Sequence, residues 1–143
     1  MNLQSHIIVG LAFGDEGKGS MVDYLVRLHG AAVVVRYSGG PQAAHNVVTP
    51  DSKHHTFAQF GSGTFAGART HLSRFMLVEP FALLKEADIL APKIGFDPFT
   101  LLTIDPLCPI VTPYHWQLNR TRAPARGAGR HGSCGMGIGE LRA

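Results

Sequence analysis

The chain has 143 residues, of which 45% are hydrophobic and 16% charged, and its formal net charge is +3. This length and composition suit one hydrophobic core, so we expect a single globular domain over residues 1–143. No apolar stretch reaches the roughly 18 residues of a membrane-spanning helix, and the N-terminus lacks the basic segment of a signal peptide. No basic run is interleaved with aromatic residues, which argues against nucleic-acid binding.

The cysteines and histidines argue against a disulfide framework and a zinc site. Cys108 and Cys134 lie far apart and show no CxxC spacing, which indicates a reduced, cytoplasmic protein. The eight histidines form neither an HxxxH nor an HExxH pattern. We therefore expect most of them to be ordinary surface or core residues.

The first third of the chain predicts a strand, a helix and a second strand. Residues 6–11 and 32–37 are apolar runs of the kind found in buried strands, and residues 18–29 between them have helical spacing. A strand–helix–strand unit favours a parallel sheet with a right-handed crossover.

A β-hairpin and a further strand are expected next. Pro50 and Asp51 favour a turn between strands at residues 46–49 and 54–60. Another strand should cover residues 70–77.

The second half of the chain predicts helices and short strands. Residues 79–91 have helical spacing, with Pro80 suited to the first turn and Pro92 expected to end the helix. The remaining elements expected are strands at 100–104 and 109–112, a helix from Pro113 to about Ala125, and a glycine-rich loop over 127–139. These elements predict an α/β fold: a mostly parallel sheet with flanking helices, similar to P-loop NTPases, with a β-hairpin excursion.

The segment from Gly14 to Gly19, GDEGKG, joins the first expected strand to the first expected helix. In such a turn, bare amides and a helix N-terminus can face a phosphate while a lysine neutralises it. A Walker A loop would need a glycine in place of Ala12 and a hydroxyl residue in place of Gly19. The residues alone leave two interpretations open, a phosphate-binding turn and an ordinary strand-to-helix turn with exposed charges.

An acid inside a phosphate-binding turn is unusual. Asp15 would repel a phosphate unless it accepted a proton or held a metal ion. The alternative is that Asp15 caps the helix by accepting backbone amides ahead of Lys18.

Together with residues 31–48, AAVVVRYSGGPQAAHNVV, the turn resembles adenylosuccinate synthetase, whose sequences read approximately WGDEGKGK, VVRYQGG and a loop ending in NAGH. Residues 54–65 (HHTFAQFGSGTF), 108–122 (CPIVTPYHWQLNRTR) and 130–140 (RHGSCGMGIGE) are similar to later segments of that family, in the same order. The resemblance covers nearly the whole chain.

The resemblance implies a GTP-dependent ligase that joins L-aspartate to C6 of inosine monophosphate (IMP), through a 6-phosphoryl intermediate, in the synthesis of AMP. It implies that Asp15 removes the N1 proton of IMP, that His45 is the general acid, and that Lys18 contacts phosphate. It also implies Mg²⁺ and a homodimer.

The remaining site residues are likewise implied by the resemblance alone. For GTP and its phosphates they are Gly14, Glu16, Gly17, Lys18, Gly19, Ala44 and His45. For IMP they are Asp15, Lys18, Gln42, Ala43, Ala44, His45, Ser133, Cys134 and Arg126, the last reaching across the dimer. For Mg²⁺ they are the Asp15 carboxylate and the backbone carbonyl of Ala44.

Several positions depart from the family pattern. Ala44 replaces a glycine, Gln42 an asparagine, Ser133 and Cys134 a pair of threonines, and Met136 an arginine. These changes leave open a relative that uses another purine monophosphate, such as dGMP.

The family continues well beyond the position of Ala143, with segments that recognise guanine and aspartate. A fragment and a natural abbreviation both remain open, and so does a catalytically silent nucleotide-binding remnant. A generic P-loop NTPase is disfavoured because Gly19 lacks the hydroxyl that such a protein needs after the lysine.

Overall fold

The structure is a computed structural model and describes residues 4–125 and 135–142. Its elements, in chain order, are α1 (Lys18–His29), β1 (Val33–Arg36), β2 (His45–Val48), β3 (His54–Phe57), η1 (Thr64–Ala66), β4 (Arg69–Leu72), α2 (Pro80–Ile94), η2 (Pro98–Leu101), β5 (Leu102–Ile104), α3 (Pro113–Ala125) and α4 (Ile138–Arg142).

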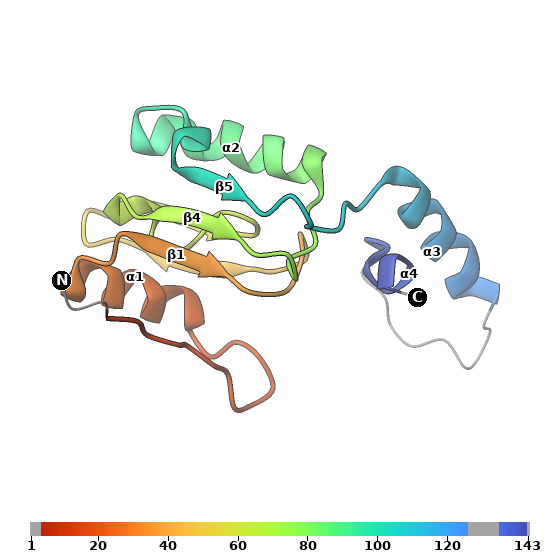
Figure 1. Ribbon diagram of the computed structural model, residues 1–143, viewed down its shortest axis with the longest axis horizontal. Coiled ribbons are helices and arrows are strands. Elements are labelled where there is room, and N and C mark those ends of the chain that lie inside the picture. Colours follow the sequence, from red (N-terminus) through yellow and green to blue (C-terminus); the bar gives the residue numbers. More distant parts are fainter. Residues whose placement is uncertain (1–3, 126–134, 143) are drawn as a thin grey trace.

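A parallel three-stranded sheet and a separate hairpin form the body of the molecule. The sheet has the strand order β1-β4-β5, and β2 and β3 pair antiparallel. Figure 1 shows α1 and α2 flanking these strands, with α3 and α4 standing together apart from the sheet. The predicted α/β fold with a parallel sheet, flanking helices and a hairpin excursion is confirmed.

The core lies between α2, the hairpin and one face of the sheet. Its buried side chains are Val47, Phe57, Phe60, Leu72, Met76, Val78, Leu83, Ala87, Leu90 and Cys108. Alternate residues of β1 point to opposite faces, so Arg36 is buried whereas Val33 and Val35 are about half exposed. β1 is therefore covered on one face only within the described part of the chain.

The predicted strand over residues 6–11 does not form. Residues 4–11 have no regular secondary structure, and the side chains of Ile7, Val9 and Leu11 are exposed. A strand needs a hydrogen-bonded neighbour, and within residues 4–125 and 135–142 no strand pairs with β1 on the side away from β4. The expected first strand–helix–strand unit is thus reduced to α1 and β1.

The helix over 18–29 and the helix starting at Pro113 have the bounds that the sequence predicts. The helix expected to end before Pro92 runs instead to Ile94. Proline lacks a donor for one helical hydrogen bond, and a single loss in the last turn is tolerated. Gly95 ends α2, with φ 86° and its amide donating to the carbonyl of Ala91 at 2.8 Å.

Three further expectations need correction. The strand predicted over 70–77 stops at Leu72, because a turn follows in which the Met76 amide donates to the carbonyl of Ser73. The strand predicted over 109–112 is reduced to a single bridge between Val78 and Ile110. The loop predicted over 127–139 overlaps helix α4 at its C-terminal end, and residues 126–134 lie outside the described part of the chain.

Among the helices that the structure describes, none is long and apolar enough to cross a membrane. The thiol of Cys108 is free and buried, and Cys134 lies outside the described residues.

Candidate functional site

Helix α1 begins at the edge of the sheet where the parallel strands end. In Figure 1 the loop before α1 lies toward the arrowhead end of β1, and the helix runs back toward the start of that strand. Ligands of parallel α/β sheets bind at this carboxyl edge, where helix N-termini present unpaired amides.

The turn before α1 is built from left-handed backbone conformations. Gly14 and Gly17 have φ of 100° and 69°, and Asp15 has φ of 51° although it carries a side chain. Aspartate tolerates this region better than most residues, and such outliers cluster at functional sites. The N-cap of α1 is Gly17, without a side-chain cap, so the interpretation of Asp15 as the helix cap is wrong.

Gly19 explains why this turn has no hydroxyl residue after the lysine. A β-carbon at Gly19 would lie 2.8 Å from the backbone oxygen of Asn46 and 2.9 Å from the carbonyl carbon of His45. Only glycine therefore lets the first turn of α1 lie against the start of β2. This contact brings the two sequence motifs, residues 14–19 and the loop ending in His45, into one site.

A cavity of about 330 Å³ lies where α1 and β2 meet. It is lined by Asp15, Glu16, Gly17, Lys18, Gly19, Ser20, Ala44, His45 and Asn46. The structure thus brings together residues 15–19 of the glycine turn with Ala44 and His45. Ser20 and Asn46 line the cavity but are not among the predicted site residues, although each directly follows one of them in the chain.

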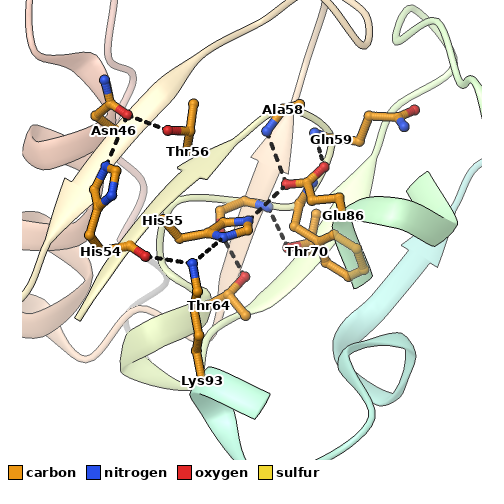
Figure 2. Close-up of polar contacts among 12 residues, drawn as sticks. Asn46, His54, His55, Thr56, Ala58, Gln59, Thr64, Thr70, Glu86 and Lys93 are labelled. Atoms are coloured by element: carbon orange, nitrogen blue, oxygen red, sulfur yellow. Dashed lines mark hydrogen bonds and ion pairs between the residues drawn. The ribbon is translucent and has the colours of Figure 1, made fainter. Parts of the chain in front are cut away.

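Ser20 and Asn46 also hold the two walls of the cavity in place. The hydroxyl of Ser20 donates to the backbone oxygen of Asn46 at 3.2 Å, which ties α1 to β2. The side-chain oxygen of Asn46 accepts from the hydroxyl of Thr56 on the neighbouring strand, as Figure 2 shows.

Other predicted site residues do not line this cavity. Gly14, Gln42 and Ala43 are described but lie outside its lining. Arg126, Ser133 and Cys134 lie outside the residues that the structure describes, so their predicted roles remain predictions.

Lys18 is held by a neighbouring carboxylate. Its ammonium group forms an ion pair with Glu16, whose other oxygen accepts a hydrogen bond from the Ala12 amide. The hydrogen bond from Lys18 and then that from Ala12 hold the pKa of Glu16 below its usual value. Glu16 thus keeps the lysine next to the start of α1, and an entering phosphate must compete with this carboxylate for it.

His45 is uncharged at neutral pH. Burial, followed by the positive charges of Arg36 and Lys18, lowers the pKa of its imidazole to about 4. A neutral ring donates a hydrogen bond from one nitrogen only. A bound anion would oppose the two positive charges and raise the pKa of His45 again.

Comparison with known proteins identifies the family. The model of the adenylosuccinate synthetase family matches residues 7–143. The chain belongs to the adenylosuccinate synthetase family. It is 36% identical over 137 residues to adenylosuccinate synthetase of Acidithiobacillus ferrooxidans, a match that covers 95% of this chain and 31% of that protein. It is 38% identical over 134 residues to the synthetase of Ectopseudomonas mendocina, covering 93% and 30%.

Solved structures share the fold. Fully ligated adenylosuccinate synthetase from Plasmodium falciparum matches with a TM-score of 0.75 and 22% identity, over 88% of this chain and 29% of that one. The succinoaminodeoxyadenylate synthetase of cyanophage S-2L, bound to dGMP and dATP, matches with a TM-score of 0.59 and 20% identity, over 76% and 30%. The chain therefore spans about 30% of the length of the synthetases that it resembles.

Proposed function

We propose that this chain forms the part of an adenylosuccinate synthetase that holds a purine monophosphate against the γ-phosphate of GTP. The proposed reaction joins L-aspartate to C6 of IMP through a 6-phosphoryl intermediate. The observation that carries the proposal is the single cavity that unites Asp15, Lys18 and His45 at the N-terminus of α1.

The proposed base is Asp15. The O6 atom of IMP is a poor nucleophile until N1 loses its proton, so a carboxylate must lie beside the purine ring. Asp15 is exposed at the cavity, and within the described part of the chain it has no hydrogen bond or ion pair that would occupy it. Asp15 does not cap α1, whose N-cap is Gly17.

Lys18, the amides of α1 and His45 would stabilise negative charge. A phosphoryl group in transfer carries charge on its outer oxygens, and catalysis of this step is mostly positioning and electrostatics. Lys18 supplies a full positive charge, and the first amides of α1 supply partial ones. His45 donates a hydrogen bond as the neutral ring, and the approaching anion favours its protonated, acidic form.

The proposal includes a magnesium ion that arrives with the nucleotide. Within the described residues no group of three or more histidine, cysteine, aspartate or glutamate side chains could hold a metal ion. Magnesium commonly uses only one or two carboxylates and completes its shell with phosphate oxygens and water. The Asp15 carboxylate and the Ala44 carbonyl would hold it, and the ion would neutralise charge on the phosphates.

A second candidate function is a nucleotide-binding remnant without turnover. The observation that favours it is that Glu16 already holds the ammonium group of Lys18 in an ion pair, so a phosphate must displace a carboxylate to reach this lysine. For the whole enzyme we also propose that it binds aspartate and guanine. We propose in addition that it forms a homodimer in which Arg126 completes the partner's site.

Isothermal titration with IMP, with dGMP and with GTP plus Mg²⁺ tests the proposal, together with an assay for adenylosuccinate. We expect IMP to bind more tightly than dGMP. The variant Lys18→Met should weaken nucleotide binding at least about tenfold, whereas Lys85→Met on the exposed face of α2 should not. The variant Asp15→Asn should keep IMP binding and lose any turnover. Binding without turnover in the unmodified chain would favour the remnant, and a folded chain that binds no nucleotide would refute both.

A further inference from the structure

Helix α2 holds the hairpin at two places, one near each end of its strands. Figure 2 shows Glu86 at the end of β3 and Lys93 near its start, both reaching from α2. Only the contact made by Glu86 lies near the strand position that pairs with His45. Glu86 contacts the residues that follow Phe57, and Phe57 is the register partner of His45.

Glu86 binds the backbone after β3 with both carboxylate oxygens. One oxygen accepts from the amides of Ala58 at 2.9 Å and Phe60 at 3.3 Å, and the other accepts from the amide of Gln59 at 2.7 Å. Glu86 is buried, so these three donors replace the water that its charge would otherwise need. The backbone of residues 58–60 is therefore fixed to α2.

Arg36 holds the same segment from the sheet. Its guanidinium is buried and donates to the carbonyl of Ala58 at 2.9 Å. Burial lowers the pKa of Arg36, and attraction to Glu86 partly opposes this effect. The amide and the carbonyl of Ala58 are thus bound by side chains of opposite charge, from α2 and from β1.

The contacts of Glu86 and Arg36 with Ala58 lie next to the candidate site. Ala58 follows Phe57, which pairs with His45, and His45 is the first residue of β2. We propose that Glu86, with Arg36 as its counterpart, is a positioning residue that fixes His45 against the start of α1. The effect on nucleotide binding rests on the proposed function, whereas the effect on the placement of His45 does not.

Lys93 provides a matched control at the other end of the hairpin. Its ammonium donates to the carbonyl of His54 at 2.7 Å and contacts Nδ1 of His55 at 3.3 Å. His54 pairs with Val48, at the end of β2 farthest from His45. Nε2 of His55 also lies 3.6 Å from a carboxylate oxygen of Glu86, so Lys93 reaches the backbone of residues 58–60 only through this longer contact. Loss of Lys93 should therefore loosen the same hairpin with a much smaller effect on the site.

The experiment compares Glu86→Gln with Lys93→Met in the full chain. Glutamine keeps the size of the side chain but offers only one acceptor oxygen, so one of the two sets of amide bonds is lost. We expect Glu86→Gln to shift the NMR signals of the His45 amide and ring and to weaken IMP binding about tenfold. Lys93→Met should lower the melting temperature but shift the His45 signals much less than Glu86→Gln and leave the affinity nearly unchanged.

Two further variants keep the test decisive. Should Glu86→Gln fail to fold, Glu86→Asp retains the charge at a shorter reach, and Arg36→Lys retains charge on the opposite side of Ala58; both should shift the His45 signals. Unchanged His45 signals in a folded variant of Glu86 or Arg36 would overturn the proposal, and so would equal shifts in Lys93→Met. Absence of nucleotide binding in the unmodified chain would refute the proposed function alone, because the His45 signals still report on positioning.

Discussion

Of two apolar stretches in this chain, one is exposed and the other is buried. Residues 6–13 contain Ile7, Val9, Leu11 and Phe13, all of them exposed, with Leu11 at 94%. Residues 54–60 contain Phe57 and Phe60, which are completely buried between α2 and the sheet. Both stretches carry the amount of apolar surface that favours burial, yet only one of them is buried.

The difference shows that an apolar run specifies a strand only when another surface covers it. Strand β3 has β2 beside it and α2 over it. Among the residues that the structure describes, nothing comparable covers residues 7–13 or the outward side chains of Val33 and Val35. Apolar surface gains free energy only in proportion to the area removed from water, so the exposed stretch contributes little to the stability of this chain.

The largest expected effect comes from making the same substitution in both regions. Leu90→Ala removes a completely buried side chain from the core, and this should lower the free energy of unfolding by about 2–5 kcal/mol. Leu11→Ala should change it by less than about 0.5 kcal/mol, because the side chain is already in water. Urea unfolding of the two variants measures both values. A loss at Leu11 as large as that at Leu90 would show that residues 6–13 are packed in solution.

Gly19→Ala should cause the next largest loss of stability, because the added methyl group pushes α1 and β2 apart. The new methyl group would meet the backbone of Asn46, and overpacking of this kind costs about 1–3 kcal/mol. Nucleotide affinity should fall as well, since α1 must move away from His45. Gly139→Ala is the control, because a β-carbon there meets no atom within 4 Å. Titration with IMP and thermal unfolding of both variants decide the point, and tight binding by Gly19→Ala would contradict the close approach.

Much of the fold could be predicted from the sequence because its signals are local. The spacing of residues 18–29 predicts α1, and the turn at Pro50 and Asp51 predicts the hairpin. The strand at residues 6–11 could not be judged in this way, because its formation depends on a neighbour that the local pattern does not contain. The prediction that α2 ends before Pro92 is wrong for a different reason. Pro92 is tolerated in the last turn, and Gly95 ends the helix.

The site was only partly predictable. Asp15, Lys18 and His45 follow from the two glycine-rich motifs, and the cavity unites them. Glu86 and Arg36 gave no sequence signal, since a lone acid on a helix and an arginine at the end of a strand are usually solvent-exposed. Their contacts to Ala58 depend on how the hairpin lies against α2 and β1.

A smaller effect is expected at the start of α2. Glu79 caps this helix by accepting from the amides of Phe81 and Ala82. Glu79→Ala should therefore lower the free energy of unfolding by about 0.5–2 kcal/mol. Asp97→Ala removes a similar cap from the short helix η2 and should cost less, because fewer residues depend on it. Equal losses in chemical unfolding would mean that the cap of α2 contributes nothing beyond its own hydrogen bonds.

The last expected effect is a pH dependence that belongs to His45. Its pKa is about 4 in the folded chain against 6.5 in the unfolded one, so the unfolded chain binds the extra proton between these values. The free energy of unfolding should therefore fall as the pH drops from about 6.5 to about 4, and change no further from this source below that. Because the side chain is only half-buried, solvent screening keeps the change below what the two pKa values alone would give. His45→Gln should remove this part of the pH dependence, which urea unfolding at pH 4.5 and 7.5 measures. An identical acid sensitivity in both proteins would show that the imidazole titrates normally, and that the charges of Arg36 and Lys18 do not reach it.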